Sequence, residues 1–411
     1  MPEFLELLPP PEAIERWMAN LPPSSPVAES LETFRALGRV TTEAIASPEA
    51  LPAFARSTVD GYAVIARDTY GASDSLPAYL TLVGEVPMGR QPDFKLQLAQ
   101  AALIYTGGML PQGADAVVMI ENTQQAAPGE IEVLRASGPG ENILKAGEDV
   151  ALQQIILSAG ARLRPPEIGG LLALGITDIH VARRPRIGVI SSGDEIVLPQ
   201  EKPSAGQVRD VNSYTLAALI EQAGGAPVLY GIVPDQRAAL QQTLQTALDN
   251  CDGIIVTAGS SASTRDLTAE VIQNLGTPGV LVHGVNLRPG KPTILAVCNG
   301  KAVVGLPGNP VSALVVASIF VTPLVERLLG MTHPRQKPAL VARLTINLAS
   351  QAGREDYVPV TLSSSPQGYL AEPIFFKSNL IFSLVRADGL IKIPSSATGL
   401  SAGDQVTVTL L

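Results

Sequence analysis

Four short segments in the second half of the chain combine glycine with carboxylates, hydroxyls or cations. They are Ser191–Glu195 (SSGDE), Thr257–Asp266 (TAGSSASTRD), Leu287–Pro292 (LRPGKP) and Leu306–Ser312 (LPGNPVS). Glycines and hydroxyl-bearing residues can surround phosphate oxygens with main-chain N–H groups. Each segment falls where a buried strand is expected to end, so the sequence predicts one polar cleft built from four loops.

The charged residues of these segments define the expected chemistry. Asp194, Glu195 and Asp266 offer hard oxygen ligands suited to Mg²⁺, which usually bridges one or two carboxylates and a phosphate. Glu195 and Asp266 are the predicted metal ligands. Arg288 and Lys291 carry charge that would neutralise an oxyanion. The predicted substrate-binding residues of the four loops are Ser192, Gly193, Asp194, Gly259, Ser261, Arg288, Gly290, Lys291, Pro307, Gly308 and Asn309.

The segment Leu306–Ser312 lies between two apolar runs and predicts a strand, a sharp turn and a buried helix. Gly308 tolerates a tight turn, Asn309 is a good N-cap, and Pro310 suits the first helical position. A helix N-terminus at the end of a strand offers free N–H groups and partial positive charge to an anion. An ordinary strand-to-helix turn could have the same sequence. This segment therefore indicates a binding site only in combination with the other three.

Several common sites are excluded by what the sequence lacks. It contains no G-x-G-x-x-G motif, no Walker lysine loop and no triad built on histidine or cysteine. Aromatic residues make up 4% of the chain and the net charge is −9, which argues against a nucleic-acid or anionic-membrane surface. An anionic substrate must therefore be held by a local pocket.

The bulk composition is that of a large folded protein. The chain has 411 residues, of which 46% are hydrophobic and 16% charged, so several packed domains are expected. Cys251 and Cys298 lie beside apolar runs and are interpreted as core thiols. No signal peptide is evident, and the longest apolar stretch, Pro310–Val325, is short for a bilayer and contains Pro323. We therefore expect a cytoplasmic protein.

The order of predicted elements changes along the chain. Residues 1–25 are proline-rich and are expected to have little fixed structure, and Ala28–Ser47 begins with helical spacing. Asp60-Gly61 is typical of a hairpin turn, and Pro77–Lys145 has the short strands of a β module. Alternating strands and helices from Arg186 to Val325 predict a parallel sheet with helices on both faces, and a final β domain follows from Pro338.

These motifs together resemble one known family. The set STVDGYAV, YTGGMLPQGADAVV, KAGEDV, SSGDEI, RDVNSYTL, RPGKP and LPGNPVSA is similar to the molybdopterin molybdenumtransferases, which include the E domain of gephyrin. The resemblance runs from about residue 28 to the C-terminus. It implies a cytoplasmic enzyme of molybdenum-cofactor biosynthesis that uses Mg²⁺ to cleave adenylated molybdopterin, inserts molybdate at the dithiolene and releases AMP.

The resemblance also implies an elongated multidomain fold. A helical and linker domain would comprise residues 1–50 and 146–180, and a β-rich domain residues 51–145. A three-layer α/β domain similar to molybdopterin adenylyltransferase would comprise residues 181–332, and a β-barrel-like domain residues 333–411. A homodimer is expected, with each active cleft completed by the partner subunit, and the adenylyltransferase is a further expected contact.

Carried over motif by motif, the resemblance adds four site residues. Asp60 and Thr106 would come from the β-rich domain, Asp235 from the α/β domain and Ser378 from the last domain. Asp60, Thr106, Glu195, Asp235 and Asp266 are thus the predicted catalytic residues. Metal-assisted phosphoanhydride cleavage needs carboxylates for Mg²⁺ and cations for the developing phosphate charge.

The sequence departs from the family pattern at several positions where a cation or glycine is usual. These are Leu144, Ala258, Ser263, Gly284 and Pro359, and Lys377 stands where a glycine usually precedes Ser378. A second hypothesis is therefore a binding or scaffolding relative that has lost turnover. A third, an adenylyltransferase or nucleotide hydrolase, has to account for the additional β domains at both ends.

Overall fold

The computed structural model describes residues 7–258, 262–332, 337–375 and 377–411, and the side chains of residues 262–266 lie outside the description. The chain divides into two compact units. Unit 1 comprises Met1–Thr42, Ala159–Arg164 and Ile179–Leu411, and unit 2 comprises Glu43–Ser158 and Pro165–Asp178.

The centre of unit 1 is a six-stranded sheet in the order β16-β13-β17-β21-β20-β18. Its strands are β13 (Arg186–Ser192), β16 (Ala226–Val233), β17 (Gly253–Ala258), β18 (Pro278–His283), β20 (Ile294–Cys298) and β21 (Lys301–Pro307). The four strands β16, β13, β17 and β21 are parallel, as expected, and each is built from the apolar run that predicted it.

The predicted parallel arrangement does not extend to β20, which runs antiparallel to both β21 and β18. The two-residue turn Asn299-Gly300 joins β20 to β21, and both residues have positive φ, 51° and 81°. Asn-Gly with two positive φ angles is the preferred sequence for a tight hairpin turn. This turn reverses the chain where a crossover helix would have kept the strands parallel.

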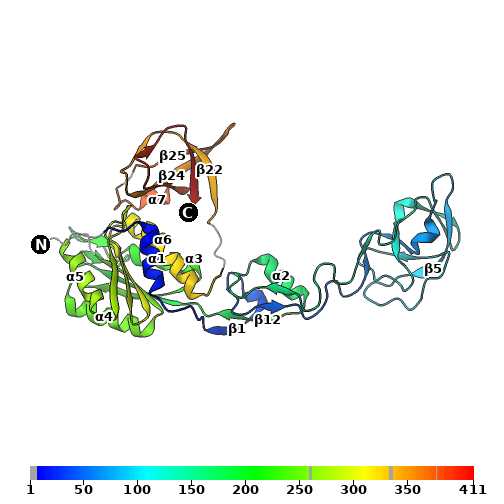
Figure 1. The fold of residues 1–411 in the computed structure, drawn as a ribbon, viewed down its shortest axis with the longest axis horizontal. Helices are drawn as coiled ribbons and strands as arrows, with labels where there is room; N and C mark the ends of the chain where they lie inside the picture. Colours follow the sequence, from blue (N-terminus) through cyan, green and yellow to red (C-terminus); the bar gives the residue numbers. More distant parts are fainter. Residues whose placement is uncertain (1–6, 259–261, 333–336, 376) are drawn as a thin grey trace. The chain divides into compact units, whose positions relative to one another are not determined.

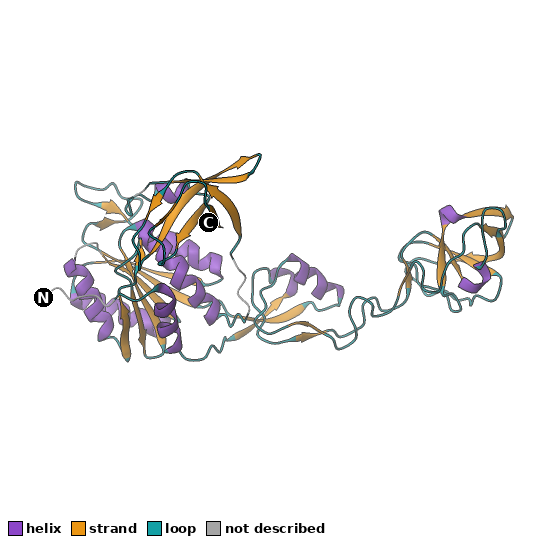
Figure 2. Cartoon of the chain, turned by 45° about the horizontal axis from the view of Figure 1, so that its top comes forward, coloured by secondary structure: helices purple, strands orange, loops and turns teal. Residues whose placement is uncertain are grey.

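Helices cover both faces of this sheet (Figures 1 and 2). On one face lie α1 (Pro10–Ala19), α3 (Asn212–Ala223) and α6 (Pro310–Leu328); on the other lie α4 (Arg237–Asn250) and α5 (Ala262–Gln273). Two apolar clusters fill the spaces between helices and sheet. Leu216 and Phe320 belong to the first cluster, and Leu244 and Ile272 to the second. This confirms the predicted three-layer α/β domain.

Helix α6 is longer than the apolar run suggested, because it continues through Pro323 to Leu328. Its 19 residues are long and apolar enough, by length and composition alone, to cross a membrane. However, 56% of the apolar window is buried inside unit 1. Phe320 and Leu324 are fully buried, and this helix therefore serves as a core element of the α/β domain.

The proline-rich N-terminus is not the unstructured leader that we expected. Residues Pro10–Ala19 form helix α1, with Pro10 at the first helical position. Ala13 and Trp17 have no exposed surface, and Trp17 Nε1 donates a 2.9 Å hydrogen bond to Ala296 O of β20. The apolar residues recur at helical spacing between the prolines, and this periodicity outweighs the proline content.

The expected helix after Ala28 is also absent. Residues Ala28–Glu32 form the exposed strand β1, followed by a short 3₁₀ helix, Thr33–Arg35. Unit 1 also contains several shorter strands outside the central sheet. They are β12 (Asp178–Ala182), β14 (Ile196–Val197), β15 (Val208–Arg209) and β19 (Leu287–Arg288).

The C-terminal part of unit 1 forms a closed five-stranded barrel, which confirms the predicted final β domain. Its strands are β22 (Ala339–Leu344), β24 (Glu355–Ser365), β25 (Gly368–Pro373), β26 (Gly389–Ile393) and β28 (Gln405–Leu410). Pairing between β24 and β26 closes the ring β24-β25-β22-β28-β26. Val360, Ile391 and Val408 fill its interior. The remaining elements are the paired β23 (Leu348–Ala349) and β27 (Gly399–Leu400) and the short helix α7 (Phe382–Val385).

Unit 2 is the predicted β module, with the strand order β7-β4-β6-β5-β9-β8. These strands are β4 (Gly61–Val64), β5 (Ala78–Glu85), β6 (Gln100–Ile104), β7 (Ala116–Met119), β8 (Thr123–Ala127) and β9 (Glu130–Val133). The unit also contains helix α2 (Pro165–Ala173). Two short strand pairs complete it: β2 (Ile45–Ala46) with β11 (Ile155–Leu157), and β3 (Arg56–Ser57) with β10 (Ile143–Leu144).

The hairpin predicted at Asp60-Gly61 is not formed, since β4 pairs with β6 and β7 while β3 pairs with β10. Gly61 is instead required for the close approach of two strands. A Cβ atom there would lie 1.9 Å from Val118 O on β7, so only glycine allows β7 to approach.

Candidate functional site

The strand registers bring three of the predicted loops to one edge of the sheet in unit 1. Ser192 at the end of β13 pairs with Val233 at the end of β16, and Ala258 at the end of β17 pairs with Pro307 at the end of β21. The loops that begin at these residues therefore leave the sheet side by side. This carboxyl edge is where open α/β sheets bind ligands.

The fourth loop, between β18 and β20, leaves from the same edge. His283 at the end of β18 pairs with Ile294, which in turn pairs with Gly305 near the end of β21. The loop therefore begins at the end of β18 and ends at the start of β20, both at this edge, and β20 then runs to the opposite edge. Arg288 and Lys291 lie in this loop, so the predicted cations reach the same edge as the predicted carboxylates.

Hydrogen bonds connect the loops after β13 and β16. The buried Ser192 hydroxyl donates to Asp235 Oδ1 at 2.6 Å, and the Asp235 main-chain N–H donates to Asp194 Oδ1 at 3.1 Å. Gly193 N donates to Val233 O at 3.3 Å. The structure therefore brings together the predicted residues Ser192, Asp194 and Asp235, and Ser192 orients the Asp235 carboxylate.

Glu195 presents an exposed carboxylate beside this pair of loops. Among the described residues, no group hydrogen-bonds or forms an ion pair with that carboxylate. A Cβ atom added at Gly193 would lie 2.8 Å from Glu195 Oε2, so glycine at position 193 makes the space that the carboxylate occupies. An exposed, anionic oxygen donor at the ligand edge of the sheet has the chemistry that Mg²⁺ requires.

Three further predicted site residues belong to the segment that follows β17. The side chain of Asp266, together with Gly259 and Ser261, lies outside the described residues. Within the described part of the chain, no group of three or more histidine, cysteine, aspartate or glutamate side chains is placed to hold a metal ion.

The loop that carries Arg288 and Lys291 packs closely on its surroundings. Residues Leu287–Arg288 form β19, which pairs in parallel with β24 of the barrel. Gly290 has φ +120°, and a Cβ atom there would lie 2.2 Å from Val316 Cγ2 on α6. Glycine therefore lets this loop lie directly on the helix that begins at the adjacent loop.

A buried carboxylate from the barrel faces Arg288. Arg288 Nη1 lies 3.8 Å from Asp356 Oδ2, and the Arg288 side chain remains 62% exposed. Arg354 binds both oxygens of Asp356, at 2.6 and 3.0 Å. This group of two arginines and one carboxylate retains a net positive charge beside the ligand edge, and Asp356 and Arg354 are contributions that sequence reasoning did not predict.

The Leu306–Ser312 segment forms the predicted strand end, turn and helix start, but Asn309 does not cap α6 with its side chain. Asn309 Nδ2 instead donates to Ser378 Oγ at 2.9 Å, and Val311 N donates to Ser378 O at 3.1 Å. Asn212 Nδ2 donates to Gly308 O at 2.8 Å. The helix start is thus connected to the barrel through Ser378 and to α3 through Asn212, a residue of the RDVNSYTL motif to which we assigned no role.

In unit 2, Asp60 and Thr106 form a pair. Thr106 N and Thr106 Oγ1 donate to Asp60 Oδ1 at 2.7 and 2.8 Å. The main-chain hydrogen bond, followed by the hydroxyl bond, lowers the pKa of Asp60 below its ordinary value of 3.8. Both residues are exposed, so this carboxylate is anionic and accessible at neutral pH.

The positions that depart from the family pattern differ in their surroundings. Gly284 adopts φ +107°, a conformation that a lysine rarely takes, and Pro359 lies within β24 where its O accepts from Ile374 N. Ala258 ends β17, Leu144 ends β10, and Lys377 is exposed beside Ser378. The side chain of Ser263 lies outside the described residues.

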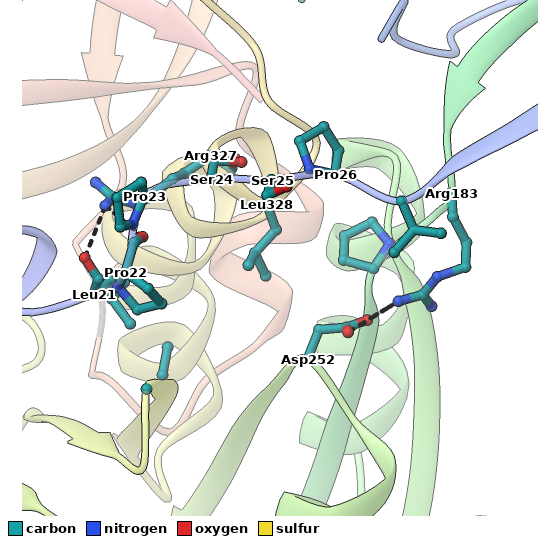
Figure 3. A pocket seen from close by; sticks show the side chains of 14 residues that line it. Leu21, Pro22, Pro23, Ser24, Ser25, Pro26, Arg183, Asp252, Arg327 and Leu328 are labelled. Atoms are coloured by element: carbon teal, nitrogen blue, oxygen red, sulfur yellow. Dashed lines mark hydrogen bonds and ion pairs between the residues drawn. The ribbon is translucent and has the colours of Figure 1, made fainter.

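A pocket described in unit 1 lies away from these residues (Figure 3). It is lined by Leu21–Val27 and by residues at or near the amino-terminal ends of the strands, including Pro185, Asp252 and Gly300. Arg183 Nη2 contacts both oxygens of Asp252 at 3.0 Å on its wall. None of the predicted site residues lines this pocket, which lies at the edge of the sheet opposite the candidate site.

Three family models match consecutive parts of the chain. Residues 8–175 match the MoeA N-terminal region (domains I and II), residues 188–327 a probable molybdopterin binding domain, and residues 341–411 the MoeA C-terminal region (domain IV). The fold and its ligand edge are therefore those of a multidomain protein with a molybdopterin-binding type of α/β domain.

Relatives and solved structures agree over almost the whole chain. A molybdopterin molybdenumtransferase from Nostoc sp. is 34% identical, covering 93% of this chain and 88% of the relative, and one from Haemophilus influenzae is 32% identical, covering 92% and 93%. A crystal structure of a molybdopterin biosynthesis MoeA protein from Pyrococcus horikoshii has a TM-score of 0.87 and 30% identity, covering 99% of this chain and 100% of that one. The chain belongs to the molybdopterin molybdenumtransferase (MoeA) family.

Proposed function

We propose that the chain is a molybdopterin molybdenumtransferase that inserts molybdate into adenylated molybdopterin and releases AMP in a Mg²⁺-dependent reaction. The observation that carries this proposal is the convergence of Ser192, Glu195, Asp235, Arg288 and Asn309 on one edge of the α/β sheet. Family membership, over more than nine-tenths of the chain, supplies the substrate class.

Both proposed substrates, adenylated molybdopterin and molybdate, are anions. The carboxyl edge of the α/β sheet has groups that bind anions. Arg288 and Lys291 would neutralise phosphate or molybdate oxygens, and the hydroxyl of Ser378 would donate to one of them. Gly193, Gly290 and Gly308 keep the backbone close to the ligand, and Gly259 and Ser261 are proposed to complete the cradle. Attack of water on the phosphoanhydride frees AMP and leaves the terminal phosphate on molybdopterin. The molybdenum of molybdate becomes bound to the two dithiolene sulfurs in exchange for one oxygen, which leaves as water with the two dithiol protons.

The carboxylates are proposed to hold Mg²⁺ at the phosphoanhydride. Glu195 and Asp266 would be its protein ligands, and the hydrogen bond from Ser192 would orient Asp235 for a catalytic role. When bound, Mg²⁺ would neutralise charge that develops on the phosphate oxygens. Asp60 stays ionised because Thr106 lowers its pKa, so we propose that it acts as a fixed hydrogen-bond acceptor and not as a proton-transferring base.

The remaining expectations complete this proposal. They are a homodimer in which the partner subunit contributes to the cleft, the four-domain division given above, cytoplasmic localisation, and contact with the molybdopterin adenylyltransferase. Gly284 and Pro359, which stand where cations are usual, favour a second candidate, a pterin-binding or scaffolding relative without turnover.

Paired glutamate variants test the proposed metal site. Glu195→Gln removes the charge of the carboxylate at the ligand edge, whereas Glu201→Gln changes an exposed glutamate six residues further along. We expect AMP release from adenylated molybdopterin to fall by about a hundredfold or more in the first variant and to be unchanged in the second. Equal rates in the two variants would contradict the assignment of Glu195.

A further inference from the structure

The loop with the two proposed anion-binding cations is held from outside the α/β sheet. Main-chain pairing connects Val285 in parallel with Leu8, near the N-terminus. Leu8 N donates to Gly284 O at 3.4 Å, and Asn286 N donates to Leu8 O at 2.7 Å. The N-terminal chain therefore adds a short strand to the first residues of the loop that leads to Arg288 and Lys291.

Side-chain packing strengthens this pairing. Leu8 is 7% exposed and belongs to the same apolar cluster as Val285 and Leu287, which are both almost fully buried. Leu287 immediately precedes Arg288. Packing of Leu8 in this cluster thus limits the positions that the main chain of Arg288 can adopt.

The segment Leu8–Pro22 is fixed along its whole length, which allows it to hold the loop. Trp17 of α1 is fully buried and donates to Ala296 O on β20, the strand that follows the loop. Arg327 Nη2 of α6 donates to Leu21 O at 3.1 Å and to Pro22 O at 3.0 Å (Figure 3). The segment thus has anchors at the loop, at the middle of the sheet and at the end of α6.

The barrel holds the same loop from another side. Glu355 N donates to Asn286 O at 3.1 Å, and the Asn286 side-chain amide donates to Gly353 O. The main chain of Asn286 therefore pairs with Leu8 through its N–H and with β24 through its carbonyl. Two separate parts of unit 1 determine the position of one residue that lies two positions before Arg288.

We propose that the segment Leu8–Pro22 is a positioning element of the substrate site, which holds the Gly284–Thr293 loop so that Arg288 and Lys291 face the anionic substrate. This inference rests on the proposed function for the identity of the anion. None of the site motifs includes the N-terminal segment. Leu8 has no group that would contact the substrate in this role, since it acts through its main chain and through packing.

Two matched truncations test the proposal. Deletion of residues 2–6 retains Leu8, and deletion of residues 2–8 removes it. We expect the longer deletion to speed hydrogen exchange of the Asn286 amide and to raise the KM for adenylated molybdopterin about tenfold with little change in kcat, while the shorter deletion changes neither. A merely structural role would lower the melting temperature and the active fraction without changing KM.

A side-chain variant keeps the test decisive if the longer deletion does not fold. Leu8→Ala leaves the main chain in place and should raise KM less than the deletion, and Leu8→Ile should restore the original KM. Unchanged Asn286 exchange, or unchanged KM with faster exchange, would overturn the proposal. Failure of the proposed function would show differently, as absence of AMP release by the full chain, and the exchange comparison would still decide whether Leu8 positions the loop.

Discussion

Asn309 and Ser378 join the two ligand-facing parts of unit 1, because Asn309 Nδ2 at the start of α6 donates to Ser378 Oγ beside the barrel at 2.9 Å. Val311 N donates to Ser378 O in the same place. The helix N-terminus is therefore connected to the barrel domain by a side-chain and a main-chain hydrogen bond. Ser378 reaches the edge of the α/β sheet although it lies 69 positions after Asn309 in the sequence.

A double-mutant cycle measures this connection. We expect Asn309→Ala and Ser378→Ala each to lower kcat/KM, and the double variant to lower it by less than the product of the two effects. The coupling expected for one such hydrogen bond is about 1 kcal/mol. Independent effects in the kcat/KM of the three variants would show that the hydrogen bond does not contribute to the site.

The pKa of Asp60 should respond to its threonine partner. Thr106→Val removes the hydroxyl donor and leaves the main-chain donor, so the pKa of Asp60 should rise part of the way toward 3.8. Because the folded-state pKa is depressed, the contribution to stability is complete well above pH 3.8 and is lost as pH falls through the lowered value. Carboxylate chemical shifts followed by NMR during an acid titration provide the measurement.

Glycine at position 290 should be required for packing and not only for its backbone conformation. Gly290→Ala places a Cβ atom 2.2 Å from Val316 Cγ2, whereas Gly403→Ala has the same kind of positive φ with no atom within 4 Å. We expect about 1–2 kcal/mol of destabilisation from the backbone in both variants and a further ~1–3 kcal/mol in the first. Urea titrations that give the two variants equal losses would contradict the close packing of this loop.

The two cysteines should be chemically inert in the native protein. Both are buried, and burial raises the pKa of the Cys298 thiol to about 11. The thiolate is the reactive form, so a thiol reagent at pH 8 should label neither cysteine in the folded chain and both after denaturation. Rapid labelling of Cys298 under native conditions would show that its surroundings open to solvent.

The sequence predicted the sheet edge because apolar runs and the polar segments after them are local signals. Ser192 and Asp194 could be placed near Pro307 without coordinates, since parallel strands end at the same edge. The dipeptide Asn299-Gly300, where the chain reverses direction between β20 and β21, is typical of a hairpin turn. The alternation of strands and helices around it nevertheless favoured a parallel arrangement.

Other contacts required the folded chain. The pairing of Leu8 with Val285 and the approach of Asp356 to Arg288 join residues that are far apart in sequence, and neither carries a local pattern. The burial of Trp17 was not predicted, because the prolines around its helix indicated a segment of little fixed structure. The apolar residues of this helix nevertheless have helical spacing. Asn309 had the sequence of an N-cap, and its side chain is instead directed to Ser378 by the packing of the barrel on α6.

The most direct test of the proposed function is AMP release from adenylated molybdopterin by the purified 411-residue chain, with Mg²⁺ and molybdate each present or absent. We predict release that requires both ions, because the carboxylates and cations at the sheet edge would act on a metal-bound phosphoanhydride and an oxyanion. Substrate that binds without any release of AMP under all four conditions would contradict it, and would identify the chain as a binding relative.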